Sequence, residues 1–189
     1  MREILRPLCI PEPTGRLAYL LSRSRLEWNY KKYVFRAHDN ILTARHRMPR
    51  DKFDAYFKFA FVRNPWERLV SEYEFLLTRP QHGRYKRVKN LENFQAFIHM
   101  QIPRYDAYQL NMLCDKNGDL LMDYVGKMEH LQSDWETACN KGGIPFQALP
   151  HKNPTPRRHY QEYYDKDSIQ LVATQWAREI EQFEYTYDD

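Results

Sequence analysis

An arginine stands at the end of an apolar and aromatic stretch, where a buried strand is expected to end. The stretch FKFAFVRNPWERLVSEYEF, residues 57–75, places Arg63 before Asn64 and Pro65, which are typical of a helix start. A guanidinium beside the backbone N–H groups and positive dipole of a helix N-terminus attracts anions. At 3.6 residues per turn, Ser71 lies near the helix face of Asn64, so its hydroxyl can reach an anion that Arg63 holds. The spacing therefore predicts an anion site.

The same residues also permit a purely structural interpretation. In it, Arg63 pairs with Glu67 or Glu72 and the Ser71 hydroxyl bonds a carbonyl of its own helix. The residues alone leave both interpretations open.

The segment FVRNPWERLVSEY closely resembles the 3'-phosphate-binding segment of the membrane-type carbohydrate sulfotransferases, including the short bacterial members often called sulfotransferase family 2. In that family an arginine and a serine eight residues later hold the 3'-phosphate of 3'-phosphoadenosine 5'-phosphosulfate (PAPS). These two positions match Arg63 and Ser71. The resemblance covers roughly residues 33–187 and includes three further segments: RAHDNILTARHRMPRDKFDAYFKFAF, DLLMDYVGKMEHLQSDW and LPHKNPTPRRHYQEYYD.

The resemblance implies a P-loop-NTPase-like, three-layer αβα sandwich with a mostly parallel central sheet, built as a single sulfotransferase-like domain over residues 1–189. It also implies transfer of a sulfuryl group from PAPS to a hydroxyl of a carbohydrate, such as a polysaccharide or glycolipid. Such a transfer needs a base for the acceptor hydroxyl. His38 resembles the position of the family's catalytic histidine, and His46 is the nearby competitor; a surface histidine is the alternative for either.

The donor loop departs from the family's pattern. In the family a loop after the first strand, with lysine, threonine and glycines, holds the 5'-phosphosulfate; the candidate here is CIPEPTGRLAYLL, in which Thr14 and Gly15 match and Arg16 adds charge. Glu12 stands where the resemblance requires lysine, and at 4 Å and an effective dielectric of 20 this exchange costs on the order of 4 kcal/mol. Either the loop has degenerated, or Met1 begins the chain late and the loop lies upstream.

A late irregular segment, residues 145–160, carries Lys152, Arg157, Arg158 and His159 between prolines. These cations suit the donor phosphates, with Arg158 as a donor-binding candidate, or an anionic sugar. A solvated basic loop is the alternative.

Alternating helices and strands are predicted to position these residues. Asn64 as N-cap with Glu67 three residues later indicates a capping box. The Asn-Gly of DKNGD indicates a turn, and glycine closes the helix at 130–143. Strands separated by helices imply an α/β fold, in which ligands bind beyond the carboxyl ends of the strands. The expected helices are 16–30, 43–56 with a break near Pro49, 65–78, 91–100, 130–143 and 168–183; the expected strands are 3–10, 33–35, 56–62 and the segment after 119.

The composition limits the expected ligands, metal sites and cellular location. The net charge is +4, which favours anionic ligands but does not establish nucleic-acid binding. Three cysteines without C-x-x-C spacing favour a reducing compartment, and the histidines show no metal-ligand spacing, so no metal site is expected. No run of 18 apolar residues and no signal peptide occurs, which favours cytoplasm, with the Golgi lumen as the alternative if the chain is a fragment.

Two other functions stay open from the sequence. Glu12 motivates a non-catalytic nucleotide-binding relative that keeps the 3'-phosphate site but not the transfer chemistry. The basic charge and RRHY with its neighbouring tyrosines motivate a nucleic-acid-binding module, although no nucleic-acid motif occurs and no such partner is expected.

Overall fold

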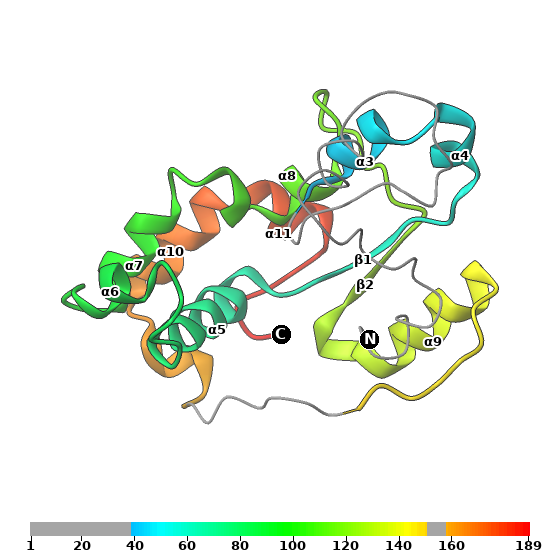
Figure 1. Cartoon of the computed structure of the whole chain (residues 1–189). Coiled ribbons are helices and arrows are strands. Elements are labelled where there is room, and N and C mark those ends of the chain that lie inside the picture. The colour runs from blue at the N-terminus through cyan, green and yellow to red at the C-terminus, as the bar shows by residue number, and fades with distance from the viewer. Residues whose placement is uncertain (1–38, 151–157) are drawn as a thin grey trace. The chain divides into compact units, whose positions relative to one another are not determined.

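The computed structural model describes residues 39–150 and 158–189. The predicted elements before residue 39 and the site candidates Thr14, Gly15, Arg16 and His38 lie outside the described residues. In chain order the elements are α3 Ile41–Arg47, α4 Arg50–Ala55, β1 Phe59–Val62, α5 Pro65–Leu77, α6 Tyr85–Lys89, α7 Phe94–Gln101, η3 Tyr105–Ala107, α8 Gln109–Leu113, β2 Tyr124–Lys127, η4 Met128–His130, α9 Leu131–Gly142, η5 Tyr160–Tyr163, α10 Lys166–Gln175 and α11 Ala177–Gln182 (Figure 1).

Strands β1 and β2 pair as a small parallel sheet, drawn as two adjacent arrows in Figure 1. The carbonyl of Lys58 accepts from the backbone N–H groups of Asp123 and Tyr124 just before the paired strands begin. β1 is shorter than the predicted strand 56–62, because Tyr56 ends helix α4. Helices mixed with a parallel strand pair agree with an α/β fold, and the three-layer sandwich stays a prediction.

The chain divides into two compact units. The described residues of the first unit are 39–60, 111–126 and 132–150, and its buried centre includes Trp135, whose ring lies 5.8 Å from that of Phe59. The Trp135 indole N–H donates to the carbonyl of Gln147 at 2.8 Å, which ties α9 to the irregular segment after it. The described residues of the second unit are 61–110, 127–131 and 158–189, and they include Arg63 and Ser71.

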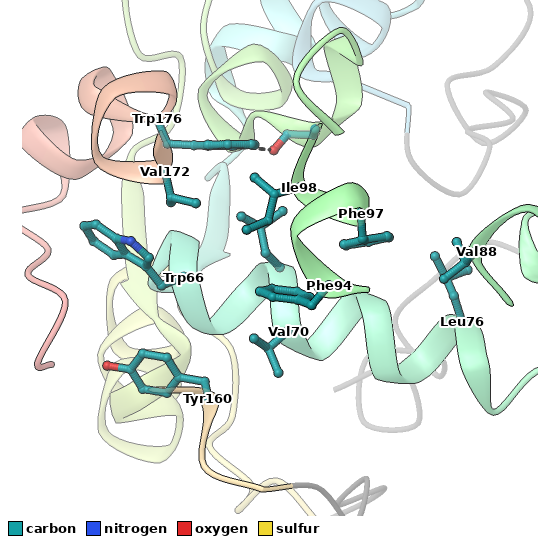
Figure 2. Close-up of a cluster of buried hydrophobic side chains, with 12 residues drawn as sticks. Trp66, Val70, Leu76, Val88, Phe94, Phe97, Ile98, Tyr160, Val172 and Trp176 are labelled. Carbon is teal, nitrogen blue, oxygen red and sulfur yellow. Dashed lines mark hydrogen bonds between the residues drawn. The ribbon is translucent and has the colours of Figure 1, made fainter. Parts of the chain in front are cut away.

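The core of the second unit is formed by apolar faces of α5, α7 and α10. Side chains from these helices and from α6, with Ala107, Tyr160 and Trp176, make one cluster (Figure 2). Helix α5 contributes residues at helical spacing, which gives it one buried face and leaves another for polar side chains. The buried residues of the cluster are Trp66, Leu69, Val70, Leu76, Val88, Phe94, Phe97, Ile98, Ala107, Tyr160, Val172 and Trp176.

Several predicted boundaries are confirmed. A break at Pro49 separates α3 from α4. The Asn-Gly turn places Gly118 at φ 91° and is closed by an antiparallel bridge between Cys114 and Leu120. Helix α9 ends before Gly143, whose φ of 63° suits glycine.

The predicted helix 168–183 is wrong in its continuity. Trp176, with φ −105° and ψ 21°, separates α10 from α11. Its fully buried ring stacks on Tyr108 at 5.1 Å, and its indole N–H donates to the carbonyl of Ala107 at 3.0 Å. The break between α10 and α11 therefore lies where the Trp176 ring packs into the core, although helical periodicity predicts one continuous helix there. No helix in the described ranges is long and apolar enough to cross a membrane.

Candidate functional site

The turn between β1 and α5 carries the predicted anion-binding arginine. Asn64 is fully buried and caps α5, because its side-chain oxygen accepts from the Trp66 N–H at 3.0 Å. The Asn64 side-chain amide also donates to the carbonyl of Thr186 at 2.7 Å. The Asn64 backbone N–H donates to Glu129 Oε1 at 2.7 Å, so Glu129 occupies the donor that the expected capping box assigns to Glu67.

The Arg63 guanidinium faces two side chains of α5. Its Nη1 donates to Ser71 Oγ at 2.8 Å, and its Nε lies 3.6 Å from Glu67 Oε2. Arg63 therefore pairs with Glu67, as the structural interpretation expects, and also reaches the serine two turns along the helix. The anion site itself stays a prediction. Glu72 pairs instead with Arg84.

One donor of Arg63 is left without a hydrogen bond. Nε is buried and has no hydrogen-bond partner within the described ranges, since 3.6 Å to Glu67 is too long for one. A buried N–H without a partner is costly and marks a position where a ligand acceptor is favourable. Because Ser71 Oγ accepts from Arg63, its hydroxyl hydrogen is directed elsewhere and can donate to the same ligand.

The helix start offers fewer backbone donors than the sequence suggests. Pro65 has no N–H, and the N–H of Trp66 is bonded to the cap Asn64. The capacity of this turn to bind an anion therefore rests mainly on the side chains of Arg63 and Ser71.

Gln109 bonds both backbone groups of Arg63. Its Oε1 accepts from the Arg63 N–H at 2.9 Å, and its Nε2 donates to the Arg63 carbonyl at 2.9 Å. The same Nε2 donates to Glu179 Oε2 at 3.1 Å, and Glu179 Oε1 accepts from the Leu110 N–H at 3.1 Å. Glu179 is 2% exposed, and this burial raises the pKa of its carboxyl, opposed by these hydrogen bonds and by the charge of Arg68.

Glu129 is the second residue that fixes this turn. Besides accepting from Asn64, it accepts from the Tyr185 hydroxyl at 3.2 Å, and Lys127 Nζ lies 4.4 Å from the Tyr185 ring centroid. Burial, followed by the charge of Glu129, raises the pKa of Tyr185. The ends of β1 and β2 and the C-terminal segment are thus joined through one carboxylate.

Sequence reasoning missed these supporting residues. Glu129 lies in the segment DYVGKMEHL that carried part of the resemblance, but no role was inferred for it. Gln109 and Glu179 gave no local signal, since each acts on a residue far away in the sequence.

Arg158 is linked to α5 through Tyr163 and Glu74. It is exposed, with its guanidinium 4.8 Å from the ring centroid of Tyr163, and the Tyr163 hydroxyl donates to Glu74 Oε1 at 2.8 Å. Glu74 follows Ser71 by about one turn of α5. Within the described residues, no hydrogen bond or ion pair joins Arg158 to Ser71. Lys152 and Arg157 lie outside the described residues, and His46 is exposed in the last turn of α3.

Within residues 39–150 and 158–189, no group of three or more His, Cys, Asp or Glu side chains is placed to hold a metal ion.

No solved structure gives a significant match to the chain. An uncharacterized protein of Archaeoglobus fulgidus is 31% identical over 103 residues, which make 53% of this chain and 79% of that protein. Residues 16–186 match the family model described as the sulfotransferase family. Because this match spans most of the sequence, including the turn that carries Arg63 and Ser71, the chain belongs to the sulfotransferase family, in the group called sulfotransferase family 2.

Proposed function

We propose that this protein transfers a sulfuryl group from PAPS to a hydroxyl of a carbohydrate. Membership of the family supports sulfuryl transfer in general, and the donor and acceptor are the proposal. The observation that carries it is the Arg63 guanidinium, which bonds Ser71 and keeps a buried Nε without a hydrogen-bond partner among the described residues.

This pair fits the 3'-phosphate of the donor. A phosphate oxygen that accepts from Arg63 Nε satisfies the orphaned donor, and the Ser71 hydroxyl supplies a second donor from the same helix. Guanidinium groups match phosphate geometry better than ammonium groups do, because their N–H groups form a planar fork. The hydrogen bonds of Gln109 to the backbone N–H and carbonyl of Arg63 fix the start of this side chain.

In this proposal the turn acts by binding and orienting the donor. PAPS supplies the activated sulfuryl group, and transfer depends on in-line positioning and on charge stabilisation at the reacting oxygens. Thr14, Gly15 and Arg16 are the proposed contacts to the 5'-phosphosulfate, and His38 is the proposed base for the acceptor hydroxyl. Arg158 is proposed to bind a donor phosphate from the neighbouring part of the same unit.

The test is a turnover assay with radiolabelled PAPS and a panel of neutral and acidic glycans. We expect labelled product with at least one glycan, and a loss of at least about a hundredfold in the Arg63→Ala variant. Circular dichroism and adenosine 3',5'-bisphosphate binding report folding and the donor site separately. A folded wild-type protein that yields no product with any glycan contradicts the proposal.

A second candidate is a nucleotide-binding relative without transfer activity, which Glu12 favours. It predicts adenosine 3',5'-bisphosphate binding without turnover. In that case Glu12→Lys is expected to tighten PAPS binding, since it replaces repulsion of the phosphosulfate by attraction. Unchanged PAPS affinity in Glu12→Lys contradicts the idea that this loop is the damaged site.

A further inference from the structure

A buried carboxylate contacts Gln109, the residue that bonds the backbone of Arg63. Glu179, in the first turn of α11, is 2% exposed and accepts from Gln109 Nε2 and from the Leu110 N–H, each at 3.1 Å. The charge of Arg68 favours the ionised form of Glu179, but the Arg68 guanidinium itself donates to two backbone carbonyls of η3. Both carboxylate oxygens therefore accept from neutral donors.

Packing alone does not explain a carboxylate at this buried position. Moving an ionised group out of water costs free energy, and hydrogen bonds from neutral donors offset this cost only in part. Where apolar residues of similar volume replace buried ionic groups, stability is often unchanged or higher. We therefore expect Glu179 to contribute something that an apolar side chain does not, which is a fixed orientation of its polar neighbour.

Glu179 determines which way the amide of Gln109 faces. Gln109 Nε2 donates to Glu179 Oε2 and to the Arg63 carbonyl, while Gln109 Oε1 accepts from the Arg63 N–H. A carboxylate oxygen can only accept, so it pairs with the NH2 group of an amide and repels its oxygen. In the reversed orientation the amide oxygen would face Glu179 and the Arg63 carbonyl, and the NH2 group would face the Arg63 N–H. The carboxylate thus disfavours the orientation in which Gln109 bonds neither backbone group of Arg63.

Glu179 is itself held by the core of the second unit. Its backbone N–H donates to the carbonyl of Trp176 at 3.0 Å, and the buried Trp176 indole donates to the carbonyl of Ala107 at 3.0 Å (Figure 2). Glu179, Gln109 and Arg63 all belong to this unit. A binding residue is precise when the residues that support it are locked by packing and hydrogen bonds of their own. Glu179 meets this condition.

We propose that Glu179 is a positioning residue for the 3'-phosphate of the donor, acting through Gln109 on Arg63. This inference rests on the proposed donor site. Glu179 restricts the backbone from which the Arg63 side chain extends, and so keeps the buried Nε and the neighbouring Ser71 hydroxyl ready for one phosphate. A donor that is fixed before the ligand arrives loses less conformational freedom on binding. The effect of Glu179 is therefore specific to nucleotides that carry a 3'-phosphate.

The experiment is calorimetric titration of the full chain with adenosine 3',5'-bisphosphate and adenosine 5'-diphosphate. The variant is Glu179→Gln, which keeps the size of the side chain but places an NH2 group opposite one of two N–H donors. We expect affinity for the 3',5'-bisphosphate to fall about three- to tenfold, as for one lost hydrogen bond, and affinity for the 5'-diphosphate to change less than about twofold. Glu181→Gln is the matched control, because Glu181 is exposed on the same helix, and we expect it to change neither affinity.

A double-mutant cycle separates positioning of Arg63 from a general effect on the fold. Arg63→Ala removes the guanidinium that Glu179 positions, so adding Glu179→Gln to it should weaken 3',5'-bisphosphate binding by less than about a further twofold. Losses that multiply in the double variant contradict action through Arg63. An equal loss for both nucleotides in Glu179→Gln, or an unchanged preference for the 3',5'-bisphosphate, also overturns the inference.

Circular dichroism and urea unfolding establish that each variant is folded before titration. If Glu179→Gln does not fold, Glu179→Asp takes its place under the same criteria, since it keeps the charge but withdraws the carboxylate by one methylene group. A preference for the 3',5'-bisphosphate that is lost in Arg63→Ala but kept in the Glu179 variant overturns this inference alone. A wild type without that preference overturns the proposed donor site together with this inference. Selective binding without turnover on any glycan overturns only the proposed catalysis.

Discussion

Replacing Glu67 by glutamine is expected to strengthen 3'-phosphate binding. The Glu67 carboxylate lies 3.6 Å from Arg63 Nε, which is the donor proposed for the phosphate. A phosphate that approaches this donor must share it with Glu67 and is repelled by the same carboxylate. Glu67→Gln removes that charge and keeps the size of the side chain.

The magnitude follows from the distance and the exposure. At 3.6 Å and an effective dielectric of 20, two unit charges interact by about 4 to 5 kcal/mol. The two side chains are 27% and 25% exposed, so solvent screening and competition reduce the net effect to about 1 to 2 kcal/mol. This corresponds to about five- to thirtyfold tighter binding.

The assay is calorimetric titration with adenosine 3',5'-bisphosphate. Glu72→Gln is the matched control, because Glu72 has the same 25% exposure on the same helix but pairs with Arg84. We expect its affinity to equal that of the wild type. Weaker binding in Glu67→Gln would refute the reasoning, since it would show that Glu67 positions Arg63 and does not compete with the ligand.

Two further predictions concern the residues that support the fold. Gln109→Ala leaves both backbone groups of Arg63 and one Glu179 oxygen without their partner, so urea unfolding should show that the free energy of unfolding falls by about 2 to 4 kcal/mol. A fall of less than about 1 kcal/mol would contradict the stabilising role of these hydrogen bonds. Burial raises the pKa of Tyr160 to about 12, so the native state keeps its proton while the unfolded chain loses it above about pH 10. Stability should therefore fall by roughly 2 kcal/mol between pH 10 and 12, and Tyr160→Phe should make this profile flatter in urea unfolding at each pH. An equally steep profile in Tyr160→Phe would exclude Tyr160 as the cause.

The sequence predicted the elements whose signals are local. Asn64 and Pro65 indicated the start of α5, and the structure confirms that Asn64 caps this helix. The glycine after α9 and the proline between α3 and α4 mark real boundaries, because the backbone requirement lies in the residue itself. The spacing of Arg63 and Ser71 likewise follows from helix geometry, which brings the two side chains to hydrogen-bonding distance.

The residues that support the turn could not be predicted in this way. Gln109 contacts Arg63 across 46 positions and Glu129 contacts Asn64 across 65, so no periodicity within one element connects them. The capping box failed for the same reason, since a distant carboxylate took the Asn64 N–H that Glu67 was expected to accept from. Trp176 divides the predicted last helix, where helical periodicity alone had favoured a continuous one.

The central claim is that Arg63 and Ser71 bind the 3'-phosphate of the donor. The most direct measurement compares adenosine 3',5'-bisphosphate with adenosine 5'-diphosphate in calorimetric titrations of the wild type, Arg63→Ala and the exposed control Arg178→Ala. The account predicts selective binding of the 3',5'-bisphosphate, kept in Arg178→Ala and weakened at least about thirtyfold in Arg63→Ala, the loss of a charge-assisted contact of about 2 kcal/mol or more. Equal affinity for the two nucleotides, or unchanged selectivity in Arg63→Ala, would contradict it.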